Sequence, residues 1–137
     1  MTRYVPAPLR DLVIERAKGR CEYCLIHEDD AIISHEVDHV IAEKHGGPST
    51  AENLAFACFP CNRYKGSDIA SVDPLSGEIL PLYNPRVDHW STHFANENGI
   101  IRPLSNISRA TVHLLKLNLP ERVLRRQGLI SLGRWPE

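Results

Sequence analysis

The four cysteines fall into two identical pairs, and these pairs constrain the fold more than any other feature. Each pair has the pattern Cys-x-x-Cys, with Cys21 and Cys24 in the first and Cys58 and Cys61 in the second. Short loops of this kind present two sulfurs to one metal ion, and four thiolates complete the tetrahedral shell of zinc. We therefore expect one structural zinc ion (Zn²⁺) that joins two segments separated by 33 residues.

The beginning of the chain favours metal ligation over disulfide bonds. Met-Thr-Arg-Tyr-Val-Pro contains no long apolar run, so we expect neither a secretory signal nor a membrane span. A cytoplasmic location follows as an expectation, and thiols stay reduced in that compartment. An apolar content of 42% is ordinary for a soluble protein, and we expect residues 1–137 to form a single domain.

Charge is distributed unevenly along the chain, although the net charge is only −1. Residues 1–20 carry +3, residues 21–101 carry −9, and residues 102–137 carry +5. Two basic ends that flanked a central site would form a surface suited to a polyanion. The alternative is a solvated terminal helix, whose basic residues are Arg122, Arg125 and Arg126.

Periodicity and turn residues predict an α+β fold. Helices are expected from Pro8 to Gly19 and over 61–65, 88–95, 108–117 and 121–127. Strands are expected over 31–41, 53–57, 69–72 and 79–82, the last two joined by a turn at 73–78. The cysteine pairs would then enclose a strand, a loop and a second strand, and the second pair would open a helix.

The segment between the cysteine pairs holds side chains suited to phosphodiester hydrolysis. Histidine is a residue type suited to take a proton from water at neutral pH, which makes His39 a candidate general base, and Asp38 offers hard oxygens to a divalent cation. Neighbours on a strand point to opposite sides, so one can hold a metal ion while the other faces the attacking water. Asn62 directly follows Cys61 and offers an amide oxygen as a second ligand. Asn53 could brace the loop or His39, or serve only as a turn or capping residue.

Five pieces of sequence, taken in order, resemble the HNH endonuclease family. They are Cys21-x-x-Cys24, Glu36-Val37-Asp38-His39-Val40-Ile41, His45-Gly46-Gly47, Glu52-Asn53-Leu54-Ala55 and Cys58-x-x-Cys61-Asn62-x-x-Lys65-Gly66. The resemblance covers about 21–66 and implies a ββα-metal core stapled by a four-cysteine zinc site. An N-terminal helix would flank this core, and 67–137 would add a C-terminal hairpin and a helical extension.

The resemblance implies a metal-dependent endonuclease with DNA as its partner. On the family pattern His39 is the general base, Asp38 and Asn62 hold a catalytic Mg²⁺ or Mn²⁺ ion, and Asn53 orients the base and its loop. Two other functions stay open: a non-catalytic zinc module that binds nucleic acid or a protein, and an HNH nuclease directed at RNA. One site per chain cuts one strand at a time, so a double-strand break would require a homodimer or two encounters.

Two positions depart from the common family pattern. Ala42 stands where many members have proline, and Asn62 stands where many have histidine; an amide oxygen favours Mg²⁺ or Mn²⁺ over zinc or nickel. Outside the core set, several side chains could contact the phosphate or the metal, with plain solvent exposure as the alternative. These are His35, Glu36, His45, Arg63 and Lys65.

Overall fold

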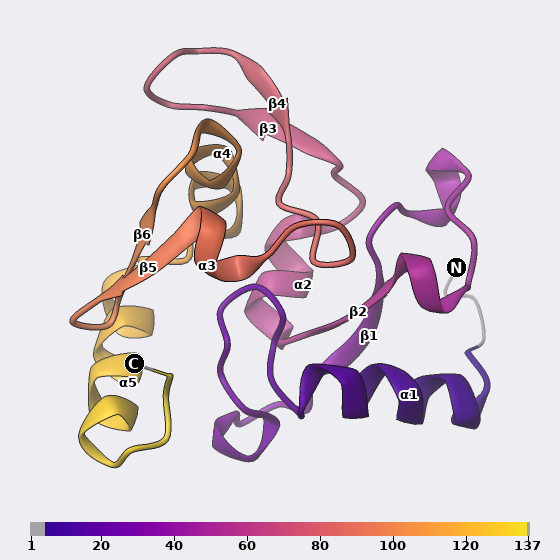
Figure 1. The fold of residues 1–137 in the computed structure, drawn as a ribbon, viewed down its shortest axis with the longest axis horizontal. Coiled ribbons are helices and arrows are strands. Elements are labelled where there is room, and N and C mark those ends of the chain that lie inside the picture. Colours follow the sequence, from indigo (N-terminus) through magenta and orange to yellow (C-terminus); the bar gives the residue numbers. More distant parts are fainter. Residues whose placement is uncertain (1–4, 137) are drawn as a thin grey trace.

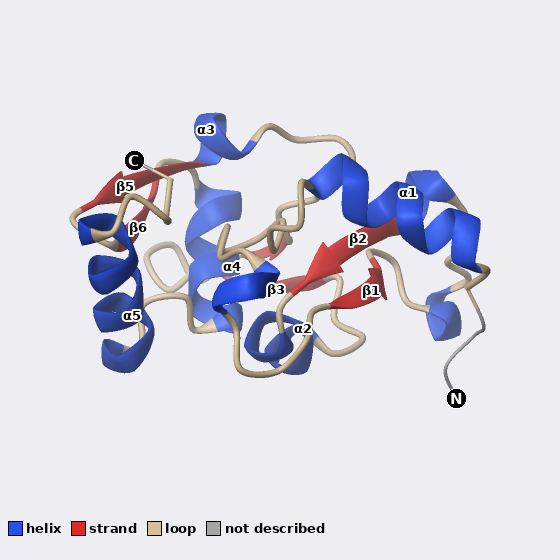
Figure 2. Cartoon of the chain, turned by 90° about the horizontal axis from the view of Figure 1, so that it is seen from below, coloured by secondary structure: helices blue, strands red, loops and turns tan. Residues whose placement is uncertain are grey.

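The structure is a computed structural model that describes residues 5–136. Its α-helices are α1 (Ala7–Ala17), α2 (Phe59–Lys65), α3 (Trp90–His93), α4 (Asn106–Leu115) and α5 (Pro120–Ser131). Its strands are β1 (Glu36–His39), β2 (Leu54–Ala57), β3 (Ala70–Val72), β4 (Ile79–Pro81), β5 (Phe94–Glu97) and β6 (Ile100–Pro103). Helices mixed with short antiparallel strands confirm the predicted α+β class (Figure 2).

The strands form three separate antiparallel pairs, β1 with β2, β3 with β4, and β5 with β6 (Figure 1). In the first pair, Asp38 lies opposite Ala55 and His39 lies opposite Leu54. The chain then leaves β2 and enters α2 within two residues. Helix α2 also contacts β1, so β1, β2 and α2 together form the predicted ββα core.

Helix α1 covers β2 and forms the smaller of two apolar clusters. Pro8 occupies its first turn, and Lys18 ends it in the left-handed conformation with φ of 56°. Val13, Leu54 and Phe56 are all buried in this cluster. The contact therefore holds the predicted N-terminal helix against the strand that lies beside the site.

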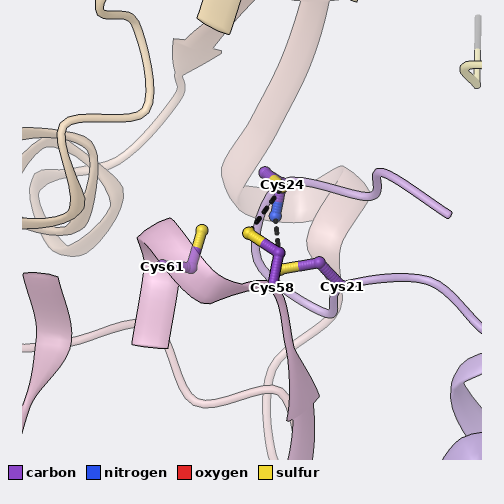
Figure 3. A group of neighbouring side chains, drawn as sticks. All are labelled: Cys21, Cys24, Cys58 and Cys61. Carbon is purple, nitrogen blue, oxygen red and sulfur yellow. Dashed lines mark hydrogen bonds between the residues drawn. The ribbon is translucent and has the colours of Figure 1, made fainter. Parts of the chain in front are cut away.

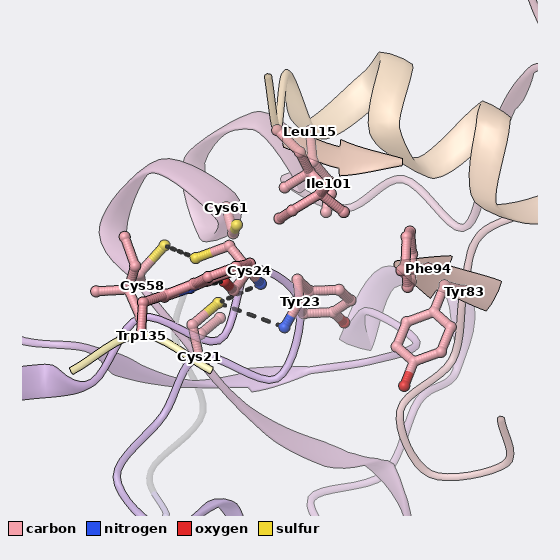
Figure 4. Packing of buried hydrophobic residues seen from close by; sticks show 13 residues of the cluster. Cys21, Tyr23, Cys24, Cys58, Cys61, Tyr83, Phe94, Ile101, Leu115 and Trp135 are labelled. Atoms are coloured by element: carbon pink, nitrogen blue, oxygen red, sulfur yellow. Dashed lines mark hydrogen bonds between the residues drawn. The ribbon is translucent and has the colours of Figure 1, made fainter. Parts of the chain in front are cut away.

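The larger apolar cluster surrounds the cysteines and extends into the C-terminal part of the chain. Figure 4 shows the four sulfurs packed beside Tyr23, Ile101, Leu115 and Trp135. Trp90 adds a hydrogen bond from its indole nitrogen to the backbone oxygen of Tyr23, at 2.8 Å. Residues of the HNH-like segment and residues that follow it in the chain therefore share one core.

The predicted helix over 88–95 is largely wrong. Only Trp90–His93 is helical, and the chain continues as β5 into a hairpin with β6. Asn98 and Gly99 form the two-residue turn, and both have positive φ, 53° and 86°. An Asn-Gly pair between two short apolar stretches is a strong hairpin signal, and it outweighs the helical spacing of the aromatic residues before it.

Other expected elements are present with shifted ends. The first strand is confined to Glu36–His39 rather than 31–41, and α5 continues through Gly128 to Ser131. Across residues 5–136, no helix has the length and apolar character needed to cross a membrane.

Candidate functional site

The four cysteine side chains converge at one point, and all are buried (Figure 3). Their sulfurs lie within 4.8 Å of one another, and the sulfurs of Cys24 and Cys58 are 3.6 Å apart. A tetrahedral zinc ion with Zn–S bonds of about 2.3 Å requires sulfurs about 3.8 Å apart. The cluster therefore fits the predicted structural zinc site.

Backbone geometry in the first cysteine pair supports thiolate ligation. The amide groups of Tyr23 and Cys24 both donate to the sulfur of Cys21, each at 3.4 Å. Burial raises the pKa of the Cys21 thiol well above its ordinary value, whereas hydrogen bonds from the neighbouring thiols lower the pKa of Cys24. Four buried thiols cannot all ionise without a cation, and a coordinated thiol is deprotonated outright.

The nuclease-type residues gather beside the metal cluster, around an open pocket of about 660 Å³. Asp38 and His39 end β1, and Asn62 lies on α2 one residue after Cys61. All three line this pocket together with Glu36. The helix that begins with the second cysteine pair thus brings Asn62 beside β1.

Asn53 does not line the pocket but fixes the loop beside it. Its side chain accepts from the backbone nitrogen of Ile41 and donates to the oxygens of Ile41 and Pro48, each at 2.9 Å. The loop is so tight that a Cβ on Gly47 would lie 1.7 Å from the oxygen of Ile41. Of the roles considered for Asn53, the structure shows bracing of the loop.

His39 points from β1 towards that same loop. Its Nε2 atom lies 2.8 Å from the hydroxyl oxygen of Ser49. Ser49 was not singled out from the sequence, because nothing in its local pattern distinguishes it from an ordinary loop serine. It is nevertheless the side chain that orients the imidazole, and the Asn53 bonds hold the loop that carries it.

Asp38 points the other way, towards α2. Its Oδ2 lies 3.1 Å from the ammonium of Lys65, which also donates to the backbone oxygen of His39 at 3.0 Å. The Asp38 pair has the distance of an ion pair but not the angle of a hydrogen bond, so this buried oxygen has no directional donor among residues 5–136. Burial raises the pKa of Asp38, and the charge of Lys65 opposes part of that rise. A buried carboxylate oxygen without a hydrogen-bond donor, as in Asp38, is a suitable ligand for a divalent cation.

Asn62 is held by a second carboxylate on β1. Its amide nitrogen donates to Glu36 at 2.7 Å, so the amide group is fixed in one orientation. Glu36 itself is exposed at the rim of the pocket. His35, by contrast, is buried, with Nε2 2.9 Å from the oxygen of Ile26 and its ring against Phe56. It is therefore a core histidine, which neither sequence interpretation anticipated.

The three residues predicted to contact phosphate differ in their exposure to solvent. His45 and Arg63 are exposed, His45 beside the pocket loop and Arg63 over the ring of Phe59. Lys65 is only 2% exposed, so both interpretations of this residue, a phosphate contact and a solvated helix face, are wrong. Its ammonium is directed into the protein because the Asp38 carboxylate and a strand carbonyl bind it there.

Two of the three C-terminal arginines also differ from both sequence interpretations. Arg122 and Arg126 are buried, so they neither solvate α5 nor offer a surface to a polyanion, whereas Arg125 is exposed. Arg122 contacts the cysteine cluster, with one guanidinium nitrogen 3.0 Å from the sulfur of Cys61. Charge counts along the sequence cannot distinguish an arginine on the surface from one buried against cysteine sulfurs.

Comparison with known proteins agrees with the geometry. Residues 21–68 match the HNH endonuclease family. Over 122 residues, 87% of this chain, the sequence is 27% identical to the Septu protein PtuB of Bacillus thuringiensis. That alignment covers 44% of PtuB, so the chain spans less than half the length of this curated relative. No solved structure gives a significant match.

The family match and the structure cover the same segment. The four cysteines, β1, β2, α2 and the pocket side chains all lie within it. Residues 21–68 therefore match the HNH endonuclease family in sequence, and they carry a four-cysteine cluster that fits a zinc site.

Proposed function

We propose that this protein is a cytoplasmic, metal-dependent endonuclease that hydrolyses phosphodiester bonds of DNA. The observation that carries the proposal is the single pocket lined by Asp38, His39 and Asn62. His39, a proton acceptor, and the side-chain oxygens of Asp38 and Asn62, which can bind a metal ion, meet there at the surface, where a nucleic-acid backbone can approach. The cysteine cluster has the separate task of holding the scaffold.

His39 acts as the general base. With the hydrogen on Nε2, its imidazole donates to the Ser49 hydroxyl, and Nδ1 carries the lone pair that accepts a proton from water. The resulting hydroxide oxygen forms a bond to phosphorus, and the bond from phosphorus to the 3′ oxygen breaks. The products carry a 5′ phosphate and a 3′ hydroxyl.

Asp38 and Asn62 would hold the divalent ion, Mg²⁺ or Mn²⁺. When bound, this ion offsets charge on the phosphate and on the leaving oxygen. Lys65 holds the Asp38 carboxylate from the protein side, and Glu36 holds the amide of Asn62. Both ligands are therefore oriented before the ion arrives, which lowers the cost of organising the site.

A plasmid assay tests the proposal. Supercoiled DNA is incubated with the zinc-loaded protein and Mg²⁺ or Mn²⁺, with and without EDTA, and nicked product is measured. His39→Ala should lower the rate at least about 100-fold, the typical contribution of a general base. His113→Ala removes an exposed histidine on α4 and should cut at the wild-type rate.

Each other outcome contradicts a defined part of the proposal. Wild-type cutting by His39→Ala, with zinc content and circular dichroism unchanged, would show that another group is the base. Absence of nicking with every metal would favour a non-catalytic zinc module. Faster cleavage of a labelled RNA in a parallel assay would favour an RNA-directed nuclease.

A further inference from the structure

The first turn of α5 places a buried cation on the cysteine cluster. Arg122 is 7% exposed, and its Nη2 lies 3.0 Å from the sulfur of Cys61 and 3.9 Å from that of Cys58. Its Nη1 donates to the oxygens of Leu115 and Lys116, at 2.7 and 3.1 Å. One guanidinium therefore joins the second cysteine pair to the C-terminal end of α4.

The negative charge of a zinc-bound cysteine cluster explains why the contact with Arg122 would be favourable. Four thiolates and one Zn²⁺ ion carry a formal charge of −2 in a site whose cysteines are at most 4% exposed. A buried net charge is costly unless a hydrogen-bonding partner of opposite charge compensates it. Arg122 supplies such a partner, and it comes from outside the matched HNH segment.

A second contact from the same C-terminal region reaches the other cysteine pair. Trp135 follows α5, is 4% exposed, and donates from its indole nitrogen to the backbone oxygen of Cys24 at 3.0 Å. Figure 4 shows its ring beside the sulfurs of Cys21 and Cys58. Arg126 lies against the face of this ring, with the guanidinium carbon 5.7 Å from its centre. Residues 120–135 thus contact both halves of the metal cluster.

We infer that residues 120–135 close the zinc site, with Arg122 as the positioning residue that neutralises the metal-bound sulfurs. Zinc makes the sulfurs anionic, and the anionic sulfurs hold Arg122 and the helix that carries it. By linkage, docking of this segment must strengthen zinc binding by the same factor as zinc strengthens docking. The inference concerns the structural metal and does not depend on the proposed nuclease activity.

The main test compares two arginines on the same helix. Arg122→Gln removes the buried charge, and Arg125→Gln removes an exposed guanidinium that donates to the backbone oxygen of Asp30. Zinc affinity is measured by competition with a chromophoric chelator. Arg122→Gln should weaken zinc binding about 10- to 100-fold, as for other residues that support metal ligands, and Arg125→Gln should stay within about twofold of wild type.

Two further readouts separate charge neutralisation from simple packing. In the cobalt-substituted protein, loss of the Arg122 hydrogen bond leaves Cys61 more electron-rich, so the thiolate-to-cobalt band should move to longer wavelength. At saturating zinc, hydrogen exchange of Arg122→Gln should speed up in 120–135 but not in α1. If the variant does not fold, Arg122→Lys, which keeps the charge but loses the forked geometry, is measured in the same way.

Zinc affinity, cobalt spectrum and exchange equal to those of wild type would overturn the inference. Weaker zinc binding with an unchanged cobalt band would also overturn it, because Arg122 would then act through packing alone.

Discussion

Lys65 offers the sharpest test of how the residues proposed to be catalytic are held in place. Lys65→Met keeps most of the side-chain volume but removes the ammonium that contacts Asp38 and the backbone oxygen of His39. Lys65 is 2% exposed and the Asp38 side chain is 14% exposed, so water cannot replace the lost partner easily. We expect the free energy of unfolding to fall substantially.

The size of the loss follows from the burial of the pair. Removing one partner of a buried ion pair costs about 3–5 kcal/mol, since the other charge is left without compensation. Asp38 can reduce this cost by taking up a proton, because burial already raises its pKa. We therefore expect a loss near the lower end, about 3 kcal/mol.

Urea unfolding of the zinc-loaded protein, followed by circular dichroism, measures this loss. Lys44→Met is the matched control, since Lys44 is exposed, and it should change the unfolding free energy by less than about 0.5 kcal/mol. In a double-mutant cycle, Asp38→Asn combined with Lys65→Met should recover about 1–3 kcal/mol relative to the sum of the single losses. A loss below about 1 kcal/mol for Lys65→Met, or strict additivity in the cycle, would refute the reasoning.

Two further predictions concern the loop and the C-terminal extension. Asn53→Ala removes three hydrogen bonds to backbone groups and should cost about 2–3 kcal/mol in urea unfolding, with slower plasmid nicking because the loop that carries Ser49 is released. Unchanged stability would show that the loop holds without this side chain. Hydrogen bonds from Arg109 lower the pKa of Asp73 below its ordinary value, so the unfolded state binds its proton first as pH falls. The stability that Asp73 contributes is complete above about pH 5 and is lost on acidification below about pH 4. Asp73→Asn should therefore flatten the fall in the free energy of unfolding between about pH 5 and 2.5. Parallel curves of unfolding free energy against pH for the two proteins would contradict this prediction.

The sequence was sufficient for the elements whose signals are local. Each of these signals lies within a few residues of the feature that it determines. The cysteine pairs determine the metal site, Gly47 determines the tight loop, and the place of Asn62 directly after Cys61 determines its position on α2. The β5–β6 hairpin has an equally local signal, Asn98-Gly99, whereas the spacing of Trp90 and Phe94 fits a helix. The turn pair determines the structure because two aromatic residues are a weaker signal than an Asn-Gly turn.

Non-local contacts could not be predicted from the sequence. Lys65 and Asp38 are separated by 26 residues, and nothing around Lys65 distinguishes a buried lysine from a solvated one. Ser49 and His39 meet across a loop that Asn53 ties to Ile41 and Pro48. Which side chains contact each other at such positions depends on the tertiary fold. Residue type and sequence spacing alone do not determine these contacts.

Helix α2 carries residues of both proposed metal sites, so the two sites are linked through it. It begins after Cys58, contains Cys61, presents Asn62 to the pocket and ends at Lys65, which holds Asp38. The helix is only seven residues long, and isolated helices of that length are marginal in water. Its position must therefore come from its contacts, which include the cysteine cluster at its start. A zinc ion bound in that cluster would help to set the distance between Asp38 and Asn62, the ligands proposed for the catalytic ion, without taking part in the chemistry itself.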